Sequence, residues 1–69
     1  MAVKILIVED DVDVLITLME FLSKSGFNAK SANSAEEAED ILKSEEINIV
    51  LTDIKLPQSH KRTVVIRRA

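Results

Sequence analysis

Three acidic residues stand where a fold could bring carboxylates together. Glu9 and Asp10 directly follow an apolar run at residues 3–8, and Asp53 directly follows another at residues 47–52. Short runs rich in β-branched residues are typical of strands that are buried on both faces. In an open parallel sheet, ligands bind outside the carboxyl ends of the strands. If the two runs are neighbouring strands, the three carboxylates converge at one edge of the sheet.

Carboxylates that lie so close repel one another, and a divalent cation is the simplest compensation. Mg²⁺ suits a site that offers one or two carboxylates, a carbonyl oxygen and waters. The alternative is that the acids from Glu9 to Asp13 only cap a following helix. That alternative stays open for Asp11 and Asp13 and is disfavoured for Asp10. Capping does not explain Asp53, because no helical pattern follows it.

The segments between these acids predict two helices and a further strand. An apolar stripe at helical spacing begins after Asp11, and Gly26 is well placed to end that helix in a left-handed conformation. Residues 27–32 alternate weakly, which predicts a short edge strand. Ser34 and Glu37 fit a capping box, in which each side chain accepts from the other residue's amide. The order β-α-β-α-β predicts an α/β fold with a parallel sheet and two right-handed crossover helices.

Composition limits the function. The chain has 69 residues, a formal net charge of −3, one histidine and no cysteine, so one small domain is expected, without disulfides or a thiolate or imidazole zinc site. A single glycine cannot build a phosphate-cradling loop for a nucleotide. The apolar runs are too short to span a bilayer, and the N-terminus lacks the layout of a signal peptide. We therefore expect a cytoplasmic protein that does not insert into membranes.

Two stretches carry a family resemblance, Lys-Ile-Leu-Ile-Val-Glu-Asp-Asp at residues 4–11 and Val-Leu-Thr-Asp-Ile-Lys-Leu-Pro at residues 50–57. Together they resemble a response-regulator receiver domain over residues 3–57. The resemblance implies a truncated flavodoxin-like (CheY-like) sheet with strand order 2-1-3. It also implies that Asp53 is the phosphoacceptor and that Mg²⁺ is held by Asp10 directly, by Glu9 through water, by Asp53 and by the backbone carbonyl of Lys55. The implied partner is a histidine kinase or a phosphotransfer protein.

The chain also departs from the receiver pattern. A receiver continues for about as much chain again, and it places a hydroxyl residue at the end of its fourth strand and a lysine after its fifth. Here Arg68 stands where the hydroxyl is expected, and no residue matches the lysine. We therefore expect an incomplete active site with impaired phosphorylation in a chain that is not itself an enzyme. A phosphatase with an aspartate nucleophile is disfavoured, because Lys55 occupies its acid/base position. The alternative function is a non-catalytic interaction or oligomerisation module.

Residues 58–69 form a basic tail after the partial receiver of residues 1–57. The tail has a formal charge of +4, whereas residues 1–57 carry −7. It has no aromatic residue to stack on a base, so nucleic-acid binding is unlikely. Residues 63–66 look like a strand. The linker between Asp53 and this strand, residues 54–62, is shorter than the dozen or so residues that a parallel crossover needs. We therefore expect this strand to return antiparallel or to exchange with a second chain, giving a homo-oligomer.

Overall fold

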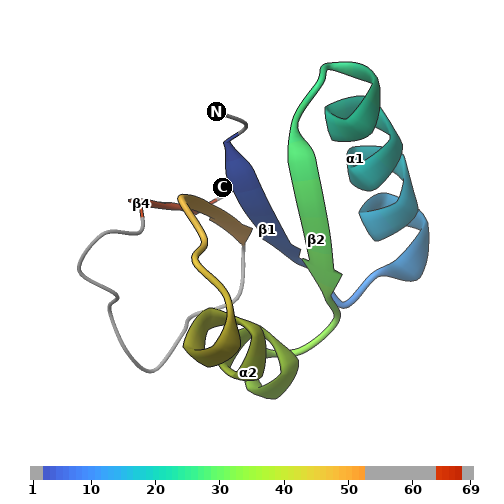
Figure 1. Ribbon diagram of the computed structural model, residues 1–69. Coiled ribbons are helices and arrows are strands. Elements are labelled where there is room, and N and C mark those ends of the chain that lie inside the picture. Colours follow the sequence, from blue (N-terminus) through green and yellow to red (C-terminus); the bar gives the residue numbers. More distant parts are fainter. Residues whose placement is uncertain (1–2, 53–63, 68–69) are drawn as a thin grey trace.

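The computed structural model describes residues 3–52 and 64–67. The described elements alternate as β-α-β-α-β-β along the chain. They are β1 (Lys4–Val8), α1 (Val12–Lys24), β2 (Asn28–Ala32), α2 (Ala35–Ser44), β3 (Ile49–Thr52) and β4 (Val64–Arg67). Figure 1 shows α1 and α2 on opposite sides of the sheet. None of the described helices is long and apolar enough to cross a bilayer.

The strands form one parallel sheet in the order β2-β1-β3-β4. The predicted order 2-1-3 is therefore confirmed, and β2 lies at an edge as predicted. Strand β1 occupies the centre and is the most apolar segment, with Leu6, Ile7 and Val8 almost completely buried. Central strands of parallel sheets are covered on both faces, which explains why this strand reads as a continuous apolar run.

The two faces of the sheet hold separate apolar cores. On the α2 face, Leu6 and Val8 pack with Leu42 and Val50. On the α1 face, Ile5 and Ile7 pack with Leu22 and the half-buried Leu18. Successive side chains of β1 thus serve opposite cores, because side chains alternate along a strand. Strand β1 is fixed from both sides, and so is the chain that leaves its carboxyl end.

Helix α1 begins and ends as its sequence predicts. The Asp11 side chain accepts from the amides of Asp13 and Val14 at 3.0 and 3.3 Å. These bonds satisfy two of the donors that a helix leaves free at its start. Beyond the last turn, Gly26 has a φ of +89°, a conformation that only glycine adopts readily. Lys24 lies in the last turn, where its charge opposes the negative end of the helix dipole.

The prediction of a capping box at the start of α2 is only half correct. The Ser34 side chain accepts from the Glu37 amide at 3.2 Å, as predicted. The Glu37 carboxylate, however, accepts from the amide of Asn33 at 3.3 Å, and not from that of Ser34. Ser34 has the extended backbone that is usual for an N-cap residue, with φ −153° and ψ 162°. The bond from the Asn33 amide links the helix to the residue that follows β2.

The expected pairing of the tail strand is wrong. Strand β4 pairs with β3 of the same chain, and the pairing is parallel, neither antiparallel nor exchanged. The prediction treated a dozen or so residues as the minimum for a parallel crossover, and that minimum is too strict for this chain. Eleven residues, 53–63, separate the two strands, and a chain of that length can extend over roughly 36 Å, well beyond the length of a four-residue strand.

Candidate functional site at the carboxyl edge of the sheet

The last rung of the sheet defines the candidate site. Val8 of β1 is level with Ala32 of β2 and with Thr52 of β3, and Thr52 is level with Arg67 of β4. Because all four strands are parallel, the segments that follow them leave from the same edge. Glu9 and Asp10 follow Val8 at this edge, and Asp53 follows Thr52 in the sequence. The juxtaposition of β1 and β3, which the sequence prediction required, is therefore present.

Glu9 is an acidic residue in a buried position, with an exposed fraction of 4%. Its amide donates to the carbonyl of Ala32 at 3.0 Å, so its backbone continues the sheet beyond β1. Its carboxylate accepts from the amide of Asp11 at 3.2 Å. Burying a carboxylate is unfavourable without compensation. This bond to Asp11 compensates in part, and it fixes the turn in which Asp10 lies.

Asp10 and Asp11 have different surroundings. Asp11 caps α1, so the structural role that was left open for it is confirmed. Asp13 lies in the first turn, where its charge suits the positive end of the helix. Asp10 is exposed, and its carboxylate makes no recorded hydrogen bond or ion pair with other described residues. The Asp10 carboxylate is therefore available for a ligand.

The other two residues of the predicted metal site, Asp53 and Lys55, lie outside the described residues. Within residues 3–52 and 64–67, no three acidic or histidine side chains gather closely enough to hold a metal ion. The fit of Mg²⁺ therefore rests on the donors at the end of β1. A buried carboxylate and an exposed one, side by side in the chain, are oxygen ligands of the kind that this cation prefers.

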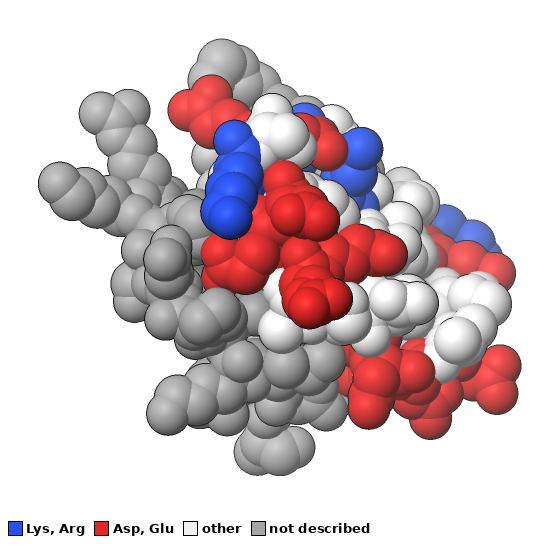
Figure 2. All heavy atoms as spheres, turned by 90° about the horizontal axis from the view of Figure 1, so that it is seen from below, with Lys and Arg blue, Asp and Glu red and all other residues white. Residues whose placement is uncertain are grey.

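The surface around this edge is acidic. Figure 2 views the molecule from the side to which β1 and β2 point in Figure 1, and acidic side chains dominate the described part of this face. Both helices begin at this edge with exposed acids, namely Asp11 and Asp13 on one and Glu36 and Glu37 on the other. Clustered charges of one sign raise the local concentration of counter-ions. The edge is therefore suited to attract cations.

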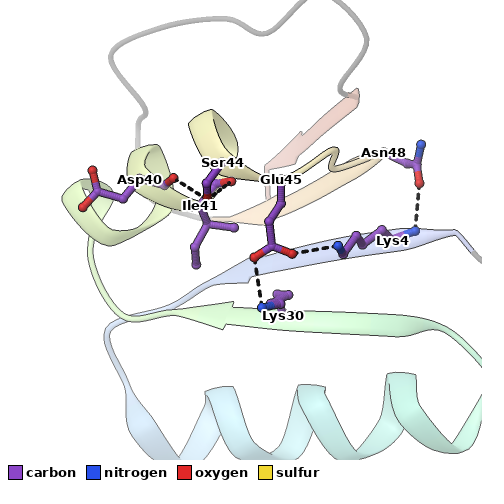
Figure 3. Close-up of polar contacts among 7 residues, drawn as sticks. All are labelled: Lys4, Lys30, Asp40, Ile41, Ser44, Glu45 and Asn48. Carbon is purple, nitrogen blue, oxygen red and sulfur yellow. Dashed lines mark hydrogen bonds and ion pairs between the residues drawn. The ribbon is translucent and has the colours of Figure 1, made fainter.

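A second polar cluster joins α2 to the sheet away from this edge (Figure 3). The Glu45 carboxylate, at the end of α2, pairs with Lys4 at 2.7 Å and with Lys30 at 2.9 Å. Hydrogen bonds from Lys4 and Lys30 hold the pKa of Glu45 below its ordinary value. The amide of Lys4 also donates to the Asn48 side chain at 2.8 Å. We call the trio of Lys4, Lys30 and Glu45 the Glu45 clasp.

Sequence reasoning missed the Glu45 clasp and the positions of Thr52 and Arg67. Lys4 was visible as the single break in an apolar run, but its partner Glu45 is distant in the sequence. Thr52, which directly precedes Asp53 in the sequence, is buried, with an exposed fraction of 1%. Arg67 lies one residue beyond the strand predicted at residues 63–66, and its backbone is level with Thr52 in the sheet. Only the strand register could have revealed that proximity.

Comparison with known proteins agrees with this architecture. The family described as the response regulator receiver domain matches residues 5–61, which is most of the chain. The chain belongs to this family. The receiver domain is also similar to the transcriptional regulatory protein CpxR of Escherichia coli K12 and to that of Shigella flexneri. The identity is 37% over 57 residues, or 83% of this chain, in both cases.

The chain spans about a quarter of the length of these curated relatives, since the match covers 24% of each. No solved structure matches the chain. The membership fixes the class of protein as a two-component response regulator receiver.

Proposed function

We propose that this receiver domain accepts a phosphoryl group on Asp53 from a histidine kinase or a phosphotransfer protein. Glu9, Asp10, Asp53 and the backbone carbonyl of Lys55 would hold Mg²⁺, which supplies positive charge for the transfer. The observation that supports this proposal is the register Val8↔Thr52. Because of this register, the residue that precedes Glu9 and Asp10 lies beside the residue that precedes Asp53, on adjacent strands.

The chemistry requires little from the protein beyond position and charge. A carboxylate oxygen of Asp53 attacks phosphorus, and the bond from phosphorus to the donor's histidine nitrogen breaks. Catalysis of phosphoryl transfer consists mainly of positioning and charge stabilisation. Glu9 contributes position by fixing the turn at Asp11, and Asp10 contributes an available carboxylate. The protein would reside in the cytoplasm, where such donors are found.

We further propose that phosphorylation is impaired, because Arg68 stands where the family pattern has its hydroxyl residue. The test is incubation of the chain with Mg²⁺ and acetyl phosphate, followed by mass measurement and peptide mapping. We expect weak labelling confined to Asp53, and no labelling in Asp53→Asn. Labelling at another aspartate would contradict the assignment. Stoichiometric, long-lived labelling would contradict the impairment.

A second candidate function is assembly. Both helices contact β1 and β2, and within the described residues neither contacts β4. Ile66 on β4 is 47% exposed, and Leu51, its neighbour in register on β3, is only half-buried. Sheets of this type are normally covered on both faces. A homo-oligomer that covers this half of the sheet would act as an interaction module without any phosphoryl transfer.

A further inference from the structure

Helix α1 carries apolar side chains on a flank that the described part of the fold leaves largely uncovered. Among the described elements the helix contacts β1 and β2, and Leu22 packs into the core on that face of the sheet. Val14, Leu18 and Phe21 recur at intervals of four and three residues and so share one side of the helix. Val14 and Leu18 are half-buried, whereas Phe21 is 65% exposed. We call these three residues and Thr17, which lies among them, the α1 stripe.

An open depression of about 250 Å³ lies within the α1 stripe, lined by Asp13, Val14, Thr17 and Leu18. The Thr17 hydroxyl donates to the carbonyl of Asp13 at 2.9 Å, so covering it leaves no hydrogen bond unmade. An apolar cavity of about 150 Å³ is enough to hold a benzene ring. The depression can therefore accept the ring of a phenylalanine.

Two copies of α1 are complementary when they pack antiparallel. With a two-fold axis beside Leu18, Phe21 of each copy lies opposite the depression of the other. The same pairing sets Lys24, in the last turn of one helix, beside Asp13 in the first turn of the other. The opposite partial charges of the helix ends also meet in this arrangement. Parallel packing would instead set Asp13 against Asp13 and Lys24 against Lys24, so the charges favour the antiparallel pair.

We propose that the α1 stripe binds the α1 stripe of a second copy of this chain, antiparallel, with the Phe21 ring of each copy in the depression of the other. This interface needs neither Asp53 nor the half of the sheet formed by β3 and β4, so it goes beyond both proposed functions. Aromatic side chains seated in pockets are the usual anchors of an interface, and Phe21 has that role here. One pair of helices buries less area than a standard interface, so the dimer is weak and transient.

Single cysteines test this contact directly, because the chain has no cysteine of its own. Thr17→Cys places a thiol beside the two-fold axis. Ser23→Cys is the control, since Ser23 is exposed and lies two residues beyond Phe21, roughly 160° around the helix from it. Under mild oxidation we expect disulfide-linked dimer to form about tenfold faster from Thr17→Cys than from Ser23→Cys, because the interface holds the two thiols close together.

Two further changes in the Thr17→Cys chain test the anchor and the direction of packing. Phe21→Ala should lower the cross-linking rate to that of Ser23→Cys, with an unchanged circular dichroism spectrum, because this side chain is mostly exposed. Lys24→Gln should lower the rate by about threefold, because each copy loses its attraction to the partner's Asp13. A rate that Lys24→Gln leaves unchanged would overturn the antiparallel arrangement.

A third change separates this interface from assembly through the sheet. Cross-linking of Thr17→Cys should persist in a chain that also carries Ile66→Lys. Loss of cross-linking in that chain would show that the copies meet through β4, which would overturn the inference and support the assembly proposal. Equal rates for Thr17→Cys and Ser23→Cys would overturn the inference, assign the α1 stripe to a different partner and leave both proposed functions standing.

Discussion

At the scale of single residues, the two acids after β1 divide their tasks. Glu9 is buried and bonded to the turn, whereas Asp10 is exposed and unengaged by other described residues. A buried carboxylate that holds a turn and an exposed one that remains available are what a cation site at a strand end requires. The position of Glu9 also explains how a charged residue can follow a fully buried strand.

Replacing Asp10 by asparagine should remove most of the stabilisation that Mg²⁺ provides. A ligand that binds only the folded state stabilises it by about 2.7 kcal/mol at a hundredfold excess over the dissociation constant. The melting temperature of the wild type should rise with Mg²⁺, and that of Asp10→Asn should rise much less. Asp13→Asn, which changes an acid in the first turn of α1, is the control. An Mg²⁺-independent melting temperature in the wild type would mean that the metal site does not form.

The Glu45 clasp should make stability depend on pH in the acidic range. Because the pKa of Glu45 is lower in the folded chain than in the unfolded one, its contribution is fully present above the pKa that the group has in the unfolded chain. The contribution is lost as the pH falls through the folded value. Urea unfolding of the wild type and of Glu45→Gln should therefore differ at neutral pH and converge in strong acid.

Glu46→Gln is the matched control for the clasp, since Glu46 is exposed and follows Glu45 directly. Its free energy of unfolding should differ little from that of the wild type at either pH. A difference between wild type and Glu45→Gln that persists unchanged into strong acid would show that the effect comes from packing and not from the ion pairs.

At the scale of elements, the turn between β1 and α1 links the site to the fold. Asp11 caps α1 with its side chain, and its amide donates to Glu9. One residue thus serves the helix start and the buried carboxylate together. The start of the helix and the geometry of the acidic pair are therefore coupled.

Asp11→Ala should destabilise the domain by about 1 kcal/mol, the usual cost of losing a cap. Asp11→Asn retains a side-chain acceptor and should cost much less. The free energy of unfolding in urea measures both effects. If both variants lost equal stability, the charge of Asp11 and not its hydrogen bonds would be responsible.

At the scale of the whole molecule, the described helices cover the sheet unevenly. The described helices contact β1 and β2, and the half of the sheet formed by β3 and β4 presents Ile66 and Leu51. Apolar surface of this kind is typical of a protein interface. It supports assembly as a function that does not depend on Asp53.

Sedimentation at micromolar concentration should therefore show a homodimer or higher oligomer. Ile66→Lys should shift the population toward monomer, because a charge in an apolar interface must be desolvated. Ile16→Lys is the control, since Ile16 is 51% exposed on α1, and among the described strands α1 contacts β1 and β2. A wild-type chain that is monomeric at every concentration would contradict the assembly proposal.

The sequence predicted whatever depends on local pattern. Apolar runs located β1 and β3, the Asp11 and Ser34 caps located the helix starts, and Gly26 located the end of α1. It failed where the outcome depends on distant partners. The pairing of β4 depends on which edge is open, and the Glu45 clasp joins residues 41 positions apart. The predicted roles of Asp53 and Lys55 stay predictions, since both lie outside the described residues.

The central position of β1 has a consequence for synthesis of the chain on the ribosome. Ile5 is level with Ile49, so β1 is completed by a strand that is made 44 residues later. At about 5–20 residues per second, that interval lasts roughly 2–9 s. Throughout it, one side of an apolar, β-branched segment has no strand beside it. A ribosome that stalled before β3 would therefore display an aggregation-prone strand, and nascent chains of this domain are expected to need chaperone protection during those seconds.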